Sequence, residues 1–336
     1  MKKVTYLVGA GASANSLPVQ ANISQQISKL QANIISNSLF SSTSDNAPLA
    51  ANLPHTNLLI NELIEDLQWL SEQSSINGSV DTYARQLYFM KEKHLLKRLK
   101  NVYSTFFVIT QSLEIPDRRY RPLINSIITE ELQIKDNVKI LSWNYDFQIE
   151  KILAEYLKTT TLKQTQTKLR IHSGFQYSLS ENISMFKLNG TVGYENMNPF
   201  DTELNPSNNN RQVHMNILRN YGVVKYSHEN YDSTLSFAWE TKDHLHLILN
   251  EIKETEILIC IGYSFPDYNR EIDIRLISQM SSNLEEIYIQ DPNANDLKQQ
   301  LQNHLRIFGS FAENINIIPL SNTDKFYIPT MLLTKQ

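Results

Sequence analysis

The N-terminus constrains the fold of this chain most strongly, because an apolar run leads directly into a loop of small residues. Residues 4–8 are Val, Thr, Tyr, Leu and Val, and Gly9-Ala10-Gly11-Ala12-Ser13-Ala14 follows them. This pattern predicts a buried parallel strand, a tight turn and then a helix N-terminus. We expect Gly9 to permit the turn, Gly11 to let a ligand approach the backbone, and Ala14 to let the helix pack close to the strand.

The same loop has the spacing of a dinucleotide-binding pattern, G-x-G-x-x-G/A. The N–H groups at the start of the next helix, expected from about Ser24, would face a bound phosphate. The carboxylate that usually binds the ribose should follow about 20 residues after the glycines, yet the first acidic residue is Asp45. The sequence thus favours the phosphate half of a nucleotide site without its usual ribose anchor. Small residues here could also serve close packing alone.

The composition is that of a globular protein. The 336 residues are enough for one large α/β domain that carries an insertion, and the hydrophobic fraction is 41%. The formal net charge of -4 gives no electrostatic reason to expect a nucleic acid or an anionic membrane as a partner. We expect no membrane span and no signal peptide, because no apolar run approaches about 18 residues.

The single cysteine, Cys260, lies within an apolar run at 257–261 and is expected to be a small buried residue. One cysteine cannot form a disulfide framework or a four-cysteine zinc site. A reducing, cytoplasmic location is therefore the expectation.

Five further strands are predicted from apolar or β-branched runs at 138–143, 185–188, 256–261, 285–290 and 315–320. Most of them end at a polar or glycine-containing turn that leads into a helical pattern. This alternation predicts an α/β fold, a Rossmann-like doubly wound parallel sheet.

About 130 residues separate the first two predicted strands, far more than a simple βαβ crossover needs. Helical patterns fill much of this stretch, including a long helix that Ser79 would cap. We therefore predict a Rossmann-type NAD-binding domain at 1–51 and 132–336, and an inserted helical module at 52–131.

Ligands of doubly wound sheets bind beyond the carboxyl ends of the strands. The segments that should converge there are Gly9–Ser13, Asn144–Asp146, Asn189-Gly190, Gly262–Ser264 and Asp291. This convergence says more about function than any single motif does.

Four of these segments resemble motifs of the sirtuin-like, or SIR2-like, family, in the family's order. Gly9–Ser13 resembles its first dinucleotide loop, Trp143–Asp146 its T-x-N-Y-D element, and Phe186–Gly190 its K-L-H-G element. Residues 262–267 are similar to the G-Y-S-x-x-D loop of the bacterial branch, and Ser79–Ala84 resembles a helix opening in bacterial antiphage members.

The resemblance implies a Rossmann-type NAD+ site, an inserted helical module and cleavage of the nicotinamide–ribose bond. Deacetylases of the family carry a four-cysteine zinc module, whereas its bacterial defence branch lacks zinc and hydrolyses NAD+ outright. With only Cys260 present, the defence branch fits better than an acyl-lysine deacylase. We thus expect NAD as the substrate, no zinc, and an antiviral effector that releases nicotinamide and ADP-ribose.

By the resemblance, Asn144 holds a water or a hydroxyl near the anomeric carbon; the alternative is a helix cap. Asp146 could bind ribose or support its loop. Ser13 and Ser264 are candidates for phosphate contacts or loop caps, and Asp291 for the adenosine ribose or an Asp-Pro turn. The other candidate cofactor-binding residues neighbour these in the same loops: Gly9, Ala10, Gly11, Ala12, Tyr145, Gly262 and Tyr263.

One candidate catalytic position departs from the family, because Asn189 stands where the family has its histidine base. Asparagine can bond a ribose hydroxyl but cannot accept a proton near neutral pH. Three interpretations stay open: an inactivating substitution that traps the cofactor, an enzyme that relies on Asn144 and needs little base catalysis, or a protein that binds a nucleotide without cutting it. His172 could supply a base, although a histidine beside a turn is more often structural. His244 and His246 would face apart on a helix and make a poor metal pair.

The chain contains little beyond the catalytic and helical parts, so we expect the sensor to lie elsewhere. A homo-oligomer or a separate sensor protein would control the effector by docking on the helical module. The alternative function is a nucleotide-binding regulatory subunit that does not hydrolyse NAD+, which Asn189 favours.

Overall fold

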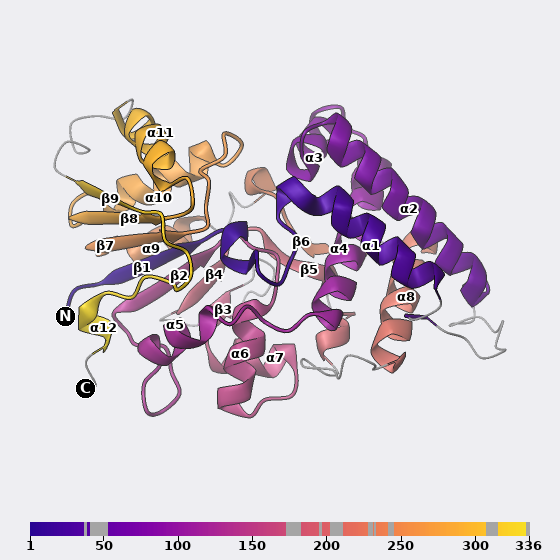
Figure 1. The fold of residues 1–336 in the computed structure, drawn as a ribbon, viewed down its shortest axis with the longest axis horizontal. Coiled ribbons are helices and arrows are strands. Elements are labelled where there is room, and N and C mark those ends of the chain that lie inside the picture. Colours follow the sequence, from indigo (N-terminus) through magenta and orange to yellow (C-terminus); the bar gives the residue numbers. More distant parts are fainter. Residues whose placement is uncertain are drawn as a thin grey trace.

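The computed structural model describes residues 1–36, 39–40, 53–172, 183–194, 197–201, 211–227, 231, 233–240, 245–306 and 315–333. A parallel β-sheet with helices on both faces lies beside a second group of helices, which packs near the carboxyl ends of the strands (Figure 1). Across these residues, every helix is too short or too polar to cross a membrane.

In the described residues, the main sheet has seven strands in the order β3-β4-β2-β1-β7-β8-β9, all parallel. The strands are β1 Val4–Val8, β2 Val138–Ser142, β3 Ile171–His172, β4 Met185–Lys187, β7 Ile257–Ile261, β8 Glu286–Gln290 and β9 Asn316–Leu320. From β1 the chain builds first towards β2 and later towards β7, so the order reverses between β1 and β7. The predicted α/β fold with a Rossmann-like doubly wound sheet is confirmed, and its topological switch point lies between β1 and β7.

Helices cover both faces of this sheet. They are α5 Tyr120–Ile127, α6 Gln148–Leu157, α7 Leu162–Lys168, α9 Leu245–Ile252, α10 Arg270–Met280, α11 Ala294–Arg306 and α12 Thr330–Leu333. Successive strand residues point to opposite faces, so Val4, Tyr6 and Val8 pack with α5 and α6, whereas Leu7 packs with α9, α10 and α11. Burial on both faces explains the unbroken apolar run at the N-terminus.

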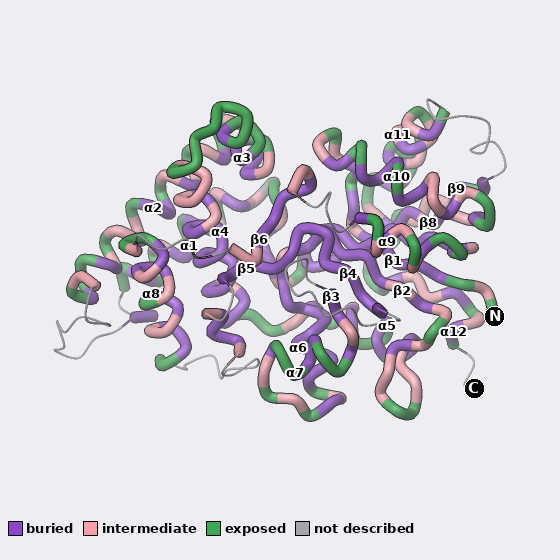
Figure 2. Tube along the Cα trace, turned by 180° about the vertical axis from the view of Figure 1, so that it is seen from behind, coloured by how far each residue is buried: buried purple, intermediate pink, exposed green. Residues whose placement is uncertain are grey.

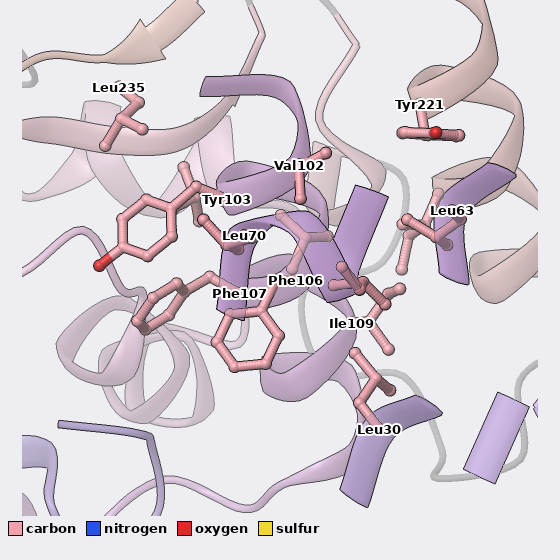
Figure 3. Packing of buried hydrophobic residues seen from close by; sticks show 14 of the residues in the cluster. Leu30, Leu63, Leu70, Val102, Tyr103, Phe106, Phe107, Ile109, Tyr221 and Leu235 are labelled. Atoms are coloured by element: carbon pink, nitrogen blue, oxygen red, sulfur yellow. The ribbon is translucent and has the colours of Figure 1, made fainter. Parts of the chain in front are cut away.

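The second group of helices, which we call the helical layer, has its own hydrophobic core. Its elements are α1 Ile23–Ile35, α2 Thr56–Ile76, α3 Val80–Phe89, α4 Lys93–Leu113, α8 Arg211–Tyr226, β5 Gly190–Tyr194 and β6 Ser233–Leu235. α4 packs against α2, α3, α8 and β5. Its side chains Val102, Phe106 and Ile109 lie among those of neighbouring helices, such as Leu30 of α1 and Leu63 of α2 (Figure 3).

The helical layer differs in extent from the module predicted at 52–131. α1 packs against α2, and α8 joins the layer from the C-terminal half, whereas α5 packs on the sheet. The role expected for Ala14 is wrong, because Ala14 is exposed and α1 packs in the helical layer instead of against β1. The boundaries of the helical layer depend on which apolar faces pack together. The distance between helices along the sequence does not reveal this.

The long helix predicted after Ser79 is two helices. Ser79 does cap the first, since its Oγ accepts a hydrogen bond from Thr82 N–H at 2.9 Å. α3 ends at Phe89 and α4 begins at Lys93, and Lys91 between them has a positive φ of 59°. The large side chains of residues 88–90 are exposed at the end of α3, and Figure 2 shows an exposed stretch of chain beside the α3 label.

Candidate functional site

A cavity of about 830 Å³ lies at the switch point, between the carboxyl ends of the strands and the helical layer. Its size falls within the range of about 300–1,000 Å³ typical of ligand pockets. The candidate residues that line it are Ala10, Gly11, Ser13, Asn144, Tyr145, Asp146, Asn189, Gly262, Tyr263, Ser264 and Asp291. Gly9 and Ala12 belong to the first of these loops, and Ala12 is buried there. The five predicted segments therefore do come together.

The loops after β1 and β7 contact each other through their glycines. A Cβ atom on Gly262 would lie 2.2 Å from Ala12 N, and one on Gly9 would lie 2.6 Å from the Gly262 carbonyl oxygen. Gly11 N–H donates to that same carbonyl oxygen at 2.9 Å. Gly11 thus serves a contact between two loops as well as lining the cavity, a role that the nucleotide pattern alone does not predict.

Replacing Gly262 with alanine is expected to lower the free energy of unfolding by about 2–4 kcal/mol, measured by chemical denaturation. The φ of 59° disfavours any side chain, and the new Cβ would also overlap the first loop. Gly78→Ala is the matched control, because Gly78 has a φ of 75° but a Cβ atom there would have nothing within 4 Å. That control should cost only about 1–2 kcal/mol. Equal losses in the two variants would contradict a close contact between the loops.

Asn144 and Asp146 are tied to the first loop by hydrogen bonds. The Asn144 amide nitrogen donates to the Gly9 carbonyl oxygen at 3.0 Å and to Ser13 Oγ at 3.3 Å. Ser13 Oγ in turn donates to Asp146 Oδ2 at 2.7 Å, and Asp146 Oδ1 accepts from Gln148 N–H at 3.1 Å. Both carboxylate oxygens of Asp146 therefore support loop structure, which is one of the two roles expected for this residue.

A buried ion pair supports the loop that follows β2. Lys187 Nζ donates to the Asp146 carbonyl oxygen and lies 3.6 Å from Glu150 Oε1. The two side chains are 1% and 0% exposed. Burial raises the pKa of the Glu150 carboxyl, and the charge of Lys187 opposes that rise. Lys187 thus links the end of β4 to the loop that carries Asn144.

Two asparagines of the cavity wall use their amide nitrogens as hydrogen-bond donors. Asn189 Nδ2 donates to the Trp143 carbonyl oxygen at 3.1 Å, while its buried Oδ1 has no hydrogen-bond partner among the described residues. The Asn144 amide oxygen likewise has no partner within the described part of the chain. Buried polar groups are normally satisfied, so the unpartnered Asn189 oxygen indicates where a bound molecule or water would be held.

The loops after β7 and β8 form another wall. Tyr263 stacks on Trp143, with ring centroids 6.1 Å apart, and its hydroxyl donates to Asp273 Oδ2 at 2.7 Å. Burial raises the pKa of Asp273 to about 8, and the hydrogen bond from Tyr263 opposes this rise. Ser264 is exposed in the wall. Asp291 Oδ1 accepts a hydrogen bond from the Asn293 N–H at 2.9 Å. This hydrogen bond forms a turn, which is one of the two roles expected for Asp291.

The cavity wall also contains polar residues that the sequence motifs did not single out: Asp81, Tyr103, Arg119 and Tyr268. Arg119 donates to the carbonyl oxygens of Gly11 and Ala12, both at 3.2 Å, and pairs with Asp117 at 2.6 Å. No periodic pattern marks Arg119 in the sequence. Asp81 could have been found, because it lies in the helix opening at 79–84.

His172, the histidine considered as a substitute base, is not among the described residues that line the cavity. His172 lies in β3 at the edge of the sheet, with β4 and β2 between it and β1, and its ring packs edge-on against Phe186. His244 lies outside the described residues. Within the described ranges, no three His, Cys, Asp or Glu side chains are grouped as metal ligands. Cys260 is buried, as predicted.

No protein-family model matches the chain, and no curated protein matches it significantly. The loop motifs and the cavity are therefore the basis for a functional proposal. Chemically, the cavity combines amide oxygens that accept hydrogen bonds, a carboxylate at Asp81 and a wall rich in tyrosine. Such a site suits a ligand with hydroxyl groups and a flat ring.

Proposed function

We propose that this protein hydrolyses NAD+ at the nicotinamide–ribose bond, giving nicotinamide and ADP-ribose. One observation carries the proposal: Asn144 and Asn189 belong to the wall of one cavity, large enough for a dinucleotide, at the switch point of the sheet, and the buried Asn189 amide oxygen has no hydrogen-bond partner among the described residues. A role as an antiviral defence effector is part of the proposal, and it rests on the likeness of the loop motifs to the SIR2-like family.

Several residues of the wall suit the parts of NAD+. The loop at 10–13 and Ser264 would hold the pyrophosphate, and Arg119 behind the loop would contribute positive charge that Asp117 partly neutralises. Asp291 would face the adenosine ribose. Asn144, Tyr145 and Asp146 would then lie on the nicotinamide side.

The reaction breaks the bond between the ribose anomeric carbon and the ring nitrogen, and positive charge develops on the ribose as neutral nicotinamide leaves. An amide oxygen can orient the attacking water or a ribose hydroxyl without itself taking a proton. Asn144 is fixed for this task, because its nitrogen is already bonded to Gly9 and Ser13. Such preorganisation lowers the cost of reaching the transition state.

Replacing Asn144 with alanine is expected to lower nicotinamide release from NAD+ by about 10²-fold or more, since a misplaced reactant costs that much. Asn137→Ala is the matched control. Asn137 precedes β2, whereas Asn144 follows it, and the Asn137 amide donates to the Lys2 carbonyl oxygen at 3.0 Å. Release should be unchanged in the control. A purified protein that neither releases nicotinamide nor unfolds at a higher temperature when NAD+ is added would overturn the proposal.

The second candidate function is NAD+ binding without hydrolysis, as in a regulatory subunit. Asn189 favours it, because an amide cannot act as a base near neutral pH. Both oxygens of Asp146 are also engaged in the loop. A rise in unfolding temperature with NAD+, combined with no nicotinamide release, would select this function over the first.

We also propose that the protein acts as a homo-oligomer or with a separate sensor protein, through the region at 52–131. Tyr88, Phe89 and Met90 support this, because they are 50%, 67% and 59% exposed at the end of α3. Clustered exposed apolar side chains often mark interaction sites. Sedimentation of the purified chain at several concentrations separates self-association from a monomer that needs another partner.

A further inference from the structure

The helical layer contributes a carboxylate to the cavity. Asp81 lies in the first turn of α3 and lines the same cavity as Asn144 and Asn189. The Tyr145 hydroxyl donates to Asp81 Oδ1 at 2.7 Å. Because Tyr145 follows Asn144 directly in the loop after β2, this hydrogen bond joins the helical layer to the proposed site of bond cleavage.

Three tyrosines from different elements line the cavity near Asp81 and interact with it electrostatically. Tyr103 comes from α4, Tyr145 from the loop after β2, and Tyr268 from the loop after β7. The rings of Tyr103 and Tyr145 contact edge-on, with centroids 5.5 Å apart, and Figure 3 shows Tyr103 beside Phe107 on α4. Burial raises the pKa of all three tyrosines well above the usual value, so they stay neutral and leave Asp81 as the titrating group among them.

We infer that Asp81 accepts the proton of the attacking water in the hydrolysis of NAD+, in place of the base that Asn189 cannot supply; this inference rests on the proposed function. The water oxygen forms a bond to the ribose anomeric carbon, and the bond from that carbon to the ring nitrogen breaks. Its electron pair stays on nicotinamide, which leaves neutral. The water proton passes to the Asp81 carboxylate and from there to solvent.

The other acidic residues near the cavity hold loops together or are buried beneath them. Both oxygens of Asp146 hold loop hydrogen bonds, and Glu150 is buried against Lys187. Asp273 lies beneath Tyr263 and accepts a hydrogen bond from its hydroxyl. Asp291 accepts a hydrogen bond from the N–H two residues later, within its own turn. Burial also raises the pKa of Asp81, against the opposing hydrogen bond from Tyr145, and a raised value suits proton transfer near neutral pH.

The test is nicotinamide release from NAD+ by Asp81→Asn, a change that keeps the shape of the side chain. We expect a loss of about 10²- to 10⁴-fold, with the rise in unfolding temperature caused by NAD+ retained. Asp296→Asn, at an exposed position of α11, should release nicotinamide as the unmodified chain does. Between about pH 4 and 8, the rate of the unmodified chain should rise as Asp81 loses its proton, and the Asp81→Asn rate should not.

A second variant tests proton transfer without removing the carboxylate. The hydrogen bond from Tyr145 lowers the pKa of Asp81, so Tyr145→Phe should move the rising limb of the pH profile to higher pH. A merely structural role for Asp81 would leave that limb in place.

The outcomes separate the two proposals. If the unmodified chain releases no nicotinamide, the proposed function fails, and the role of Asp81 fails with it. If the unmodified chain cleaves NAD+ and Asp81→Asn cleaves it equally well, or if Tyr145→Phe leaves the pH limb unmoved, the role of Asp81 alone is wrong.

Discussion

In the Asp81→Asn background, the substitution Asn189→His is expected to restore NAD+ cleavage by about 10²-fold or more, within the 10²- to 10⁴-fold range of a general base. A histidine there could donate one ring N–H to the Trp143 carbonyl oxygen, the acceptor that Asn189 Nδ2 uses at 3.1 Å. Its other ring nitrogen would then face the cavity as a base with an ordinary pKa of about 6.5. Initial rates of nicotinamide release measure the effect.

The same substitution in the unmodified chain should raise the rate less than about tenfold, because Asp81 already accepts the proton and a second base adds little. Asn189→Gln is the control, since it keeps an amide and provides no base. If Asn189→His raises the rate of the unmodified chain by about 10²-fold or more, the chain lacks a base, and Asn189 is what silences it.

Lys187→Met is expected to lower the free energy of unfolding by about 3–5 kcal/mol, because it leaves Glu150 buried without its partner. The pair is almost fully buried, so water cannot replace the lost interaction. The loop after β2 also loses a hydrogen bond to the Asp146 carbonyl oxygen. Urea denaturation measures the loss.

Two further variants separate this cause from others. Adding Glu150→Gln to Lys187→Met should recover much of the lost stability, because no charge then remains buried. Arg121→Met breaks an ion pair with Glu155 whose side chains are 44% and 41% exposed, and it should cost at most about 1 kcal/mol. If Lys187→Met and Arg121→Met lower the free energy of unfolding equally, burial does not strengthen the ion pair between Lys187 and Glu150.

The sheet was predictable from sequence because each of its five-residue strands is an apolar run that polar or glycine residues end. Such runs are buried on both faces of a parallel sheet and carry their signal locally. The strands β3, β5 and β6 were missed, since β3 and β6 are too short to show a pattern, and β5 is the polar and glycine-containing stretch 190–194. The break between α3 and α4 was also missed, because Lys91 adopts a positive φ without being glycine.

The site was predictable to the extent that its residues follow strands. Asn144, Asn189 and Gly262 each come directly after a strand or within two residues of one, and parallel strands bring such positions together. Asp81 and Tyr103 reach the cavity from the helical layer, whose placement depends on long-range packing. The path of α1 was predicted wrongly for the same reason, because its apolar face fits either a sheet or another helix.

The cavity lies between the sheet, whose two faces pack in separate hydrophobic clusters, and the helical layer, most of whose apolar side chains belong to a third. A molecule that fills the cavity would contact both the sheet and the helical layer, so its binding free energy would also stabilise the contact between them. Under the proposed function, cleavage of NAD+ into two smaller products would remove part of this stabilisation. Each turnover would therefore loosen and then restore the junction between the sheet and the helices beside it.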